Sequence, residues 1–440
     1  MTMQEHPLRR ALSNELHTRP FFGYDGTGRL IRYMFLFEGN DSSILAHVNS
    51  WLERCSVTII ENSEKFRREV LEHFILRIER HTEFITITFI VNDNTGNMGL
   101  PVFAFNKDAA SFLPFDMIDT MPVPVFHAIW LEVADFEGDS ITSDAICELL
   151  AVDNSGSSQI YEGAGQVHFS FDIDNTGFSR IILLKNCLNP DRVGRSILRL
   201  LELETYRILT LFGLPNVRSQ MSELSAMEKE LQELIQNLSR QIDIESNDVD
   251  ALLPRLSKIA ARVEEMSAVT SYRLSATKAY QEIFLARVSG LNMSRLDGFQ
   301  SIPGFLNRRM LPAMQTCIAF GERLNSVSER VARAGSLLRA QTETMIQNQN
   351  TALLASMDKR ASTQLRLQQT VEGLSVIAGT YYGVRLVEYI ATTIPSQYLP
   401  LAITQIKALS VPIVAFNIYT IIHQATRTKH RSVCHKNTIT

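Results

Sequence analysis

The chain has few cysteines and lacks the short motifs that mark common catalytic sites. Five of its 440 residues are cysteines, and no two of them have the CxxC spacing. An odd number of cysteines that are scattered along the chain is typical of reduced thiols in the cytosol and not of a disulfide framework. No P-loop, HExxH or GxSxG motif is present, so the sequence names no reaction. We therefore expect no catalytic residue, no cofactor and no bound metal, and we favour a protein that is not an enzyme.

The sequence also lacks an N-terminal apolar run and an excess of basic residues. Its first 20 residues contain no apolar core of the kind that a signal peptide needs. The formal net charge is −4, whereas nucleic-acid-binding domains are usually basic. Hydrophobic residues make up 45% of the chain, enough for two or three folded domains. We expect a cytosolic body with no nucleic-acid partner.

Alternation of apolar and polar residues predicts an α+β cytosolic domain over residues 1–190. Strands are expected at 28–37, 74–79, 84–91 and 126–133, a helix at 42–55, and a hairpin over 167–184. Where that hairpin reverses, Asp172, Asp174 and Thr176 imitate half of a calcium loop, but the twelfth position is Leu183. The sequence therefore favours a tight turn over a metal site.

Helical periodicity replaces strand alternation after residue 190. Helices are predicted at 195–212, 217–242 and 254–289, followed by a link at 290–312, so that 191–310 forms a helical domain with long antiparallel helices. Residues 311–373 contain no proline after Pro312 and predict one long stalk helix. Its heptad seam, a weak coiled-coil pattern, consists of Leu324, Val327, Val331, Ala334, Leu338, Gln341 and Met345. Apolar residues then resume out of register, which favours packing against other helices or sister subunits.

Two apolar segments, 374–394 and 399–422, are each close to the ~20 residues that an α-helix needs to cross a membrane. Basic residues precede the first segment and follow the second, whereas the turn at 395–398 is uncharged. This asymmetry predicts a transmembrane hairpin over 374–424 with both termini in the cytoplasm and a basic tail over 425–440. His430, Cys434 and His435 in the tail are too few and too near the chain end to indicate a metal site.

The predicted hairpin contains three charged residues, Arg385, Glu388 and Lys407. Antiparallel counting from the turn puts Lys407 level with residue 386, about mid-membrane. A charge at that depth is a candidate functional site because leaving it unpaired in lipid costs at least ~2.5 kcal/mol. An ion-paired triad that only fixes helix packing or subunit register explains the residues equally well. A third interpretation is that the hairpin lies partly in the membrane–water interface and does not span the membrane.

The N-terminal stretch HPLRRALSNELHTRP, residues 6–20, is the most specific motif of the chain. It resembles the opening signature HPLRxxLxNExHxRP of a bacterial family of uncharacterised membrane-anchored proteins, a domain of unknown function. The resemblance implies that the family match extends over nearly the whole chain and that the protein lies in the bacterial inner membrane. No reaction is assigned to the family, so the resemblance implies no activity. Five residues of the stretch could bind an anionic small ligand: His6, Arg9, Arg10, His17 and Arg19. A docking helix at 7–17 with a solvated charged face is the favoured alternative.

The order of parts is similar to that of the CorA-type magnesium transporters, pentamers with a C-terminal two-helix hairpin. The Gly-Met-Asn signature of that family is missing, and residues 390–395 stand at the corresponding end of the first segment. The excess positive charge of the intramembrane residues would also repel divalent cations. We therefore expect a membrane-anchored homo-oligomer whose cytosolic body is a sensor or recruitment module. An ion transporter or channel on a CorA-like frame is the alternative, and an enzyme acting at the membrane surface is a third class.

Overall fold

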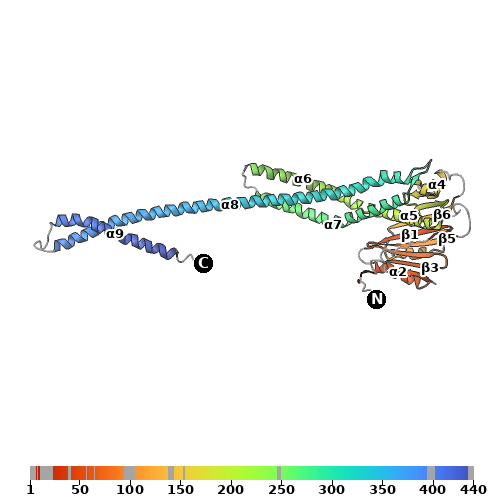
Figure 1. The fold of residues 1–440 in the computed structure, drawn as a ribbon, viewed down its shortest axis with the longest axis horizontal. Helices are drawn as coiled ribbons and strands as arrows, with labels where there is room; N and C mark the ends of the chain where they lie inside the picture. The colour runs from red at the N-terminus through yellow and green to blue at the C-terminus, as the bar shows by residue number, and fades with distance from the viewer. Residues whose placement is uncertain are drawn as a thin grey trace. The chain divides into compact units, whose positions relative to one another are not determined.

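The structure is a computed structural model that describes residues 6, 8–9, 23–37, 41–55, 57–63, 65–93, 105–136, 143–151, 154–244, 249–393 and 402–434. The chain divides into two compact units, Met1–Gly335 (unit 1) and Ser336–Thr440 (unit 2). The expected mixed α+β chain with a large sheet and long helices is confirmed (Figure 1).

Unit 1 is built on a ten-stranded sheet with the order β10-β7-β8-β9-β6-β1-β5-β4-β3-β2. Its strands are β1 (Thr27–Leu36), β2 (Thr58–Asn62), β3 (Phe66–Val70), β4 (Ile75–Arg80), β5 (Phe84–Asp93), β6 (His127–Asp135), β7 (Ser155–Ile160), β8 (Gly165–Ser170), β9 (Ser179–Lys185) and β10 (Ser294–Arg295). Neighbouring strands run antiparallel apart from β6 and β9, which are parallel. The predicted strands are confirmed, and β2, β3, β7 and β10 are additional.

Successive side chains of β1 point to opposite faces of the sheet and pack into two different hydrophobic cores. Leu30 and Met34 belong to one core, and Ile31 and Phe35 belong to the other. Because successive residues of a strand point to opposite faces, a strand whose residues are nearly all buried needs cover on both sides. The almost continuous apolar run of this strand in the sequence reflects that double burial.

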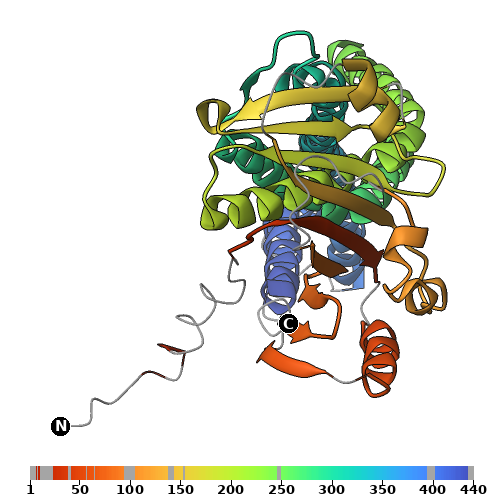
Figure 2. The same cartoon turned by 90° about the vertical axis from the view of Figure 1, so that its right-hand side faces the viewer.

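Helices supply the two covers, as Figure 2 shows. The first core contains residues of α5 (Pro190–Leu211), α7 (Val249–Gly290) and the start of α8 (Ile302–Thr393). The second core contains residues of α2 (Ser42–Leu52), α3 (Phe115–Asp119) and α4 (Ser143–Leu150). Two short 3-10 helices, η1 (Asp108–Ala110) and η2 (Tyr161–Gly163), lie in connections.

The helix α6 (Leu214–Ile244) packs with α7 and the first part of α8 in unit 1. Arg323 of α8 forms an ion pair with Glu228 of α6 at 2.6 Å. The predicted seam residues Leu324, Val327 and Val331 are buried. The heptad spacing in this part of α8 therefore serves packing inside unit 1.

The link predicted at 290–312 was wrong in its second half, because α8 begins at Ile302. Pro303 follows the first residue of the helix, where its missing N–H costs nothing, and this start signal was overlooked. Pro312 lies inside the helix and does not begin it. The long stalk helix itself is part of α8, which has 92 residues.

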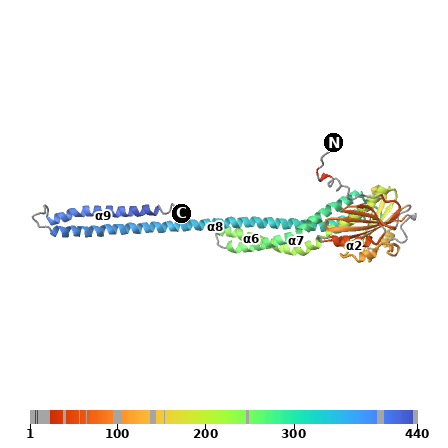
Figure 3. The ribbon, with the colours of Figure 1, turned by 90° about the horizontal axis from the view of Figure 1, so that it is seen from below.

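In unit 2, the last part of α8 lies antiparallel to α9 (Ile403–Cys434), as Figure 3 shows. A Cβ added at Gly383 would lie 2.5 Å from the Val414 Cγ1 atom, and one at Gly379 would lie 3.1 Å from Ile418. The two helices are therefore in close contact through glycines. The turn predicted at 395–398 lies outside the described residues.

Candidate functional site

The three charged residues predicted for the C-terminal segments meet in unit 2. The Lys407 Nζ atom lies 3.0 Å from the Glu388 Oε2 atom. The Arg385 guanidinium, one helical turn before Glu388, lies 3.5 Å from the same carboxylate. Antiparallel counting placed these residues at one level, and the structure brings them into contact. One carboxylate faces two cations, so the group keeps one positive charge.

A cavity of about 370 Å³ lies beside this triad. Its lining residues are Ile377, Thr380, Tyr381, Val384, Arg385, Lys407 and Val411. Both cations of the triad reach the cavity wall, whereas Glu388 is not part of it. The surroundings are therefore apolar and cationic, which suits a small anion better than a metal cation.

Apolar side chains of unit 2 point outward around the triad. Tyr389 is 72% exposed, Leu374 68% and Phe416 68%. Among the described residues, one helical segment, Thr404–Ile422 of α9, is long and apolar enough to cross a membrane, and 6% of it is buried. The α8 segment at 374–393 carries Arg385 and Glu388 among its apolar residues, which lowers its mean hydropathy. This surface lacks cover within unit 2.

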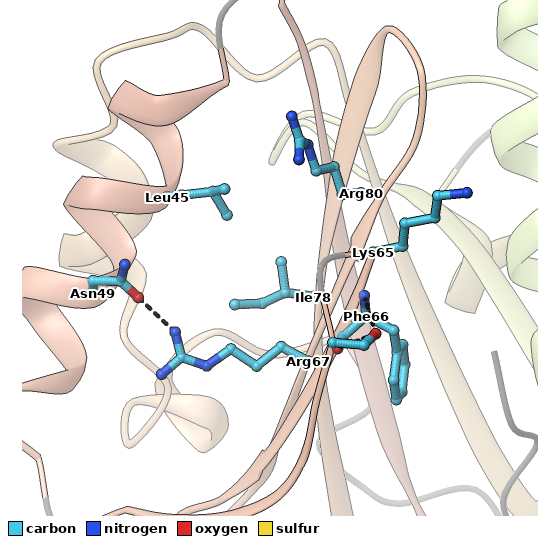
Figure 4. A pocket seen from close by; sticks show the side chains of 8 residues that line it. Leu45, Asn49, Lys65, Phe66, Arg67, Ile78 and Arg80 are labelled. Atoms are coloured by element: carbon cyan, nitrogen blue, oxygen red, sulfur yellow. Dashed lines mark hydrogen bonds between the residues drawn. The ribbon is translucent and has the colours of Figure 1, made fainter. Parts of the chain in front are cut away.

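A second candidate site is a cavity of about 270 Å³ between α2 and the strands β3 and β4 in unit 1 (Figure 4). Its lining residues are Leu45, Asn49, Ser63, Lys65, Phe66, Arg67, Ile78 and Arg80. Three of these are cationic and none is acidic. In Figure 4, Arg67 reaches across to Asn49 of α2, while Arg80 extends toward the other end of the cavity.

Acidic residues behind the cavity wall hold the two arginines in place. Arg67 forms an ion pair with Glu69 and donates a hydrogen bond to the Asn49 side-chain oxygen at 2.5 Å. Arg80 donates to the Asp41 carboxylate at 3.1 Å. The Glu69 and Asp41 carboxylates pair with Arg67 and Arg80 and fix the direction of their guanidinium groups. This arrangement can hold a small anion against fixed donors.

The predicted N-terminal ligand site is only partly visible. The backbone N–H of Leu8 donates to the His6 Nδ1 atom at 3.2 Å, and the N–H of Arg9 donates to the His6 carbonyl at 3.0 Å. His6 and Arg9 thus belong to one local turn. Arg10, His17 and Arg19 lie outside the described residues, so the proposed convergence of the five stays a prediction.

Charged groups buried in unit 1 pair with one another. The Glu79 carboxylate accepts from Arg77 of the same strand, β4, at 2.7 Å and from Arg32 of β1, two strands away in the sheet, at 3.0 Å. Burial alone would raise the pKa of Glu79, but the charges of Arg77 and Arg32 and the hydrogen bond from Arg77 outweigh it and lower the pKa to about 2. The Glu79 carboxylate therefore stays ionised at neutral pH, and its ion pair with Arg32 connects β4 to β1.

A second buried group joins the sheet to α5. The Glu204 carboxylate lies 2.9 Å from the His127 Nε2 atom and accepts from the Arg207 Nε atom at 2.6 Å. Burial opposes ionisation, yet Arg207 and the hydrogen bond with His127 lower the pKa of Glu204 to about 2. In the described part of the chain no group of three or more His, Cys, Asp or Glu side chains could hold a metal ion.

The hairpin turn that imitates a calcium loop is held by Asp174 itself. Its carboxylate accepts from the backbone N–H of Thr176 at 2.8 Å and of Phe178 at 2.9 Å, and from Arg180 at 2.6 Å. Burial would raise the pKa of Asp174, but these hydrogen bonds lower it. The predicted tight turn is therefore confirmed.

The comparison with protein families decides the family question. A family model described as a protein of unknown function (DUF3422) matches residues 4–429. The chain belongs to this family. The match covers nearly the whole chain, so the resemblance to an uncharacterised family is confirmed. Neither the curated proteins nor the solved structures contain a match.

The sequence analysis missed Gly379 and Gly383, two positions where α8 packs closely against α9. Their spacing, Gly-Thr-Tyr-Tyr-Gly, is the GxxxG pattern that lets two membrane helices approach closely. This signal was present in the sequence and could have located the packed face. The cavity between α2 and β3 had no comparable signal, because its residues come from three separate elements.

Proposed function

We propose that this DUF3422 protein is anchored in a membrane by the α8 and α9 segments of unit 2. The observation that carries the proposal is the outward-facing apolar surface around 374–393 and 404–422. In water, exposing so much apolar area is unfavourable at roughly 25 cal/mol per Å². A lipid environment removes that cost, and each α-helix satisfies its own backbone hydrogen bonds, as a membrane requires.

The charged triad fits such an anchor. Glu388 contacts both Arg385 and Lys407, so neither cation meets lipid alone. Both helices then cross the bilayer, and basic residues near 359–366 and 427–431 lie on the cytosolic side. Both termini and unit 1 are cytosolic in this proposal, and the chain forms a homo-oligomer.

Comparing the full chain with a chain that ends after Thr370 tests the anchor. The full chain should sediment with membranes after alkaline carbonate treatment and require detergent for extraction. The truncated chain should be soluble without detergent, because all segments proposed to enter lipid have been removed. A full chain that stays in the supernatant as a monomer without detergent contradicts the proposal.

Unit 1 is proposed to act as a sensor or recruitment module that binds a small anion in the cavity between α2 and β3. Inorganic phosphate, titrated calorimetrically into the detergent-purified full chain at constant ionic strength, is a suitable probe. Lys65→Gln should weaken binding several-fold, because it removes one of three cations at the cavity. Lys229→Gln changes an exposed cation on α6 and serves as the matched control. No saturable heat, or equal binding by the Lys65 variant, rules this site out.

Ion transport is the second proposed function, and the cavity lined by Arg385 and Lys407 is the observation that favours it. Its cationic wall predicts anion flux and not magnesium flux. Chloride flux into liposomes carrying the protein should fall in Arg385→Ala and Lys407→Ala variants. Unchanged flux in both variants would leave the triad as a packing device.

A further inference from the structure

No side chain in the middle of α8, residues 346–371, is buried by the described residues of the chain. Every side chain of residues 346–371 is exposed. The segment is nevertheless not uniformly polar: Leu353 is 60% exposed, Leu367 63% and Val371 62%. Isolated helices are only marginally stable in water, and most helical stability in proteins comes from packing of an apolar face. A surface of this kind calls for a partner outside the chain.

A subset of the exposed residues forms a stripe with regular spacing. Alternating steps of four and three connect Ile346, Asn350, Leu353, Met357, Arg360, Gln364, Leu367 and Val371. Such alternation is the heptad pattern of a coiled coil. The earlier seam of α8 has another phase and is buried inside unit 1 through Leu324, Val327 and Val331. The new stripe therefore differs from the first seam in heptad phase.

We propose that this stripe pairs with the same stripe of a second copy, in parallel and in register. In heptad terms Leu353 and Leu367 take d positions, whereas Asn350 and Gln364 take a positions. Leucine at d with one asparagine at a favours two parallel strands and fixes their register, since the two buried amides bond to each other. The parallel direction also rests on the proposed anchor, because both copies must enter the same membrane from the same side.

The available area is enough for such a pair. The stripe carries five apolar side chains, each between 52% and 63% exposed. Covering them on two helices removes roughly 1,000 Å² from water, near the lower end of specific protein interfaces. An interface of this size is typical of a dimer weak enough for its dissociation constant to be measured.

Arg360 is the one unfavourable position of the stripe. It occupies a d position, where it faces its own copy in a parallel dimer. Its neighbours on the flanks, Ser356, Ala361 and Thr363, are small, so the two arginine stems can lie over them and carry their charges to water. The remaining repulsion predicts tighter association in high salt and in an Arg360→Leu variant.

Cysteine crosslinking of the full chain in detergent tests direction and register. Gln364→Cys at an a position should form a disulfide between copies, because equivalent a positions lie within disulfide reach only in a parallel, in-register pair. Leu365→Cys, one residue away and off the stripe, is the matched control and should not crosslink. Wild-type protein gives the background of the five native cysteines. Equal crosslinking of both variants, or none at position 364, overturns the proposal.

Sedimentation equilibrium measures the strength of the pair. The double variant Leu353→Asn and Leu367→Asn should raise the dimer dissociation constant by about 100-fold, whereas Leu365→Asn should leave it unchanged, although Leu365 is 52% exposed. Unchanged dimerisation of the double variant overturns the proposal. If position 364 crosslinks and the full chain needs no detergent, the dimer stands and the membrane anchor fails.

Discussion

Unit 1 and unit 2 place apolar and charged side chains in opposite ways. In unit 1, strand residues such as Leu30 and Ile31 are 0% exposed, and Glu79 is 4% exposed between two arginines. In unit 2, Tyr389 is 72% exposed, and the side chain of Glu388 remains 25% exposed within its ion pairs. Unit 1 excludes water by its own packing. Unit 2 does not, so its environment must come from outside the chain, and we propose lipid and a second copy.

The largest effect that distinguishes the units is loss of a buried carboxylate. Glu79→Gln should destabilise unit 1 by about 3–5 kcal/mol, because it removes the carboxylate that pairs with the buried Arg32 and Arg77. Urea unfolding followed by tryptophan fluorescence reports on unit 1 alone, since Trp51 and Trp130 are the only tryptophans. The matched Glu388→Gln in unit 2 should leave that transition unchanged. If the two variants shift the urea unfolding transition equally, the proposed difference between unit 1 and unit 2 is contradicted.

A somewhat smaller effect concerns His168, which is 1% exposed in unit 1. Its Nδ1 atom lies 2.7 Å from the Ser157 hydroxyl, and burial lowers its pKa to about 4 from an ordinary value of 6.5. The folded state thus binds fewer protons than the unfolded state. The contribution of His168 to the free energy of unfolding is fully present above pH 6.5. It is lost as the pH falls toward 4, and the total loss is about 3 kcal/mol.

Comparing urea unfolding of wild type and His168→Gln between pH 7 and pH 4 measures this contribution. The variant should lose less stability than wild type over that interval, because glutamine does not titrate. His73→Gln is the control, since the side chain of His73 is 60% exposed. Parallel pH profiles for wild type and His168→Gln would show that the pKa of His168 is the same in the folded and unfolded states, contrary to the lowered pKa.

The smallest effect tests the contact between α8 and α9. Gly383→Ala should weaken it by about 1–3 kcal/mol, because the new methyl group overlaps Val414. Gly373→Ala meets nothing within 4 Å and should instead stabilise the helix by about 1 kcal/mol. Thermal loss of helical circular dichroism in detergent should show shifts of opposite sign. A stabilised Gly383 variant would mean that the two helices separate there.

Sequence reasoning reached the elements with strong periodicity and failed where tertiary contacts decide. The strand at 28–37 was found because both of its faces are apolar, and the contact of Glu388 with Lys407 followed from counting along antiparallel helices. Strands β2 and β3 were missed since their polar stretch, including Arg67 and Glu69, does not alternate clearly. The cavity beside Arg67 depends on three elements whose approach no local pattern encodes.

Tryptophan quenching by brominated lipids tests the central claim about unit 2 most directly. Phe416→Trp adds a reporter to α9 at a position that is 68% exposed. In liposomes with bromine on the acyl chains, the added emission should be quenched strongly, whereas the wild-type emission of Trp51 and Trp130 should not change. If the added tryptophan is not quenched although the protein is bound to the liposomes, the exposed apolar surface of α9 is covered by something other than lipid.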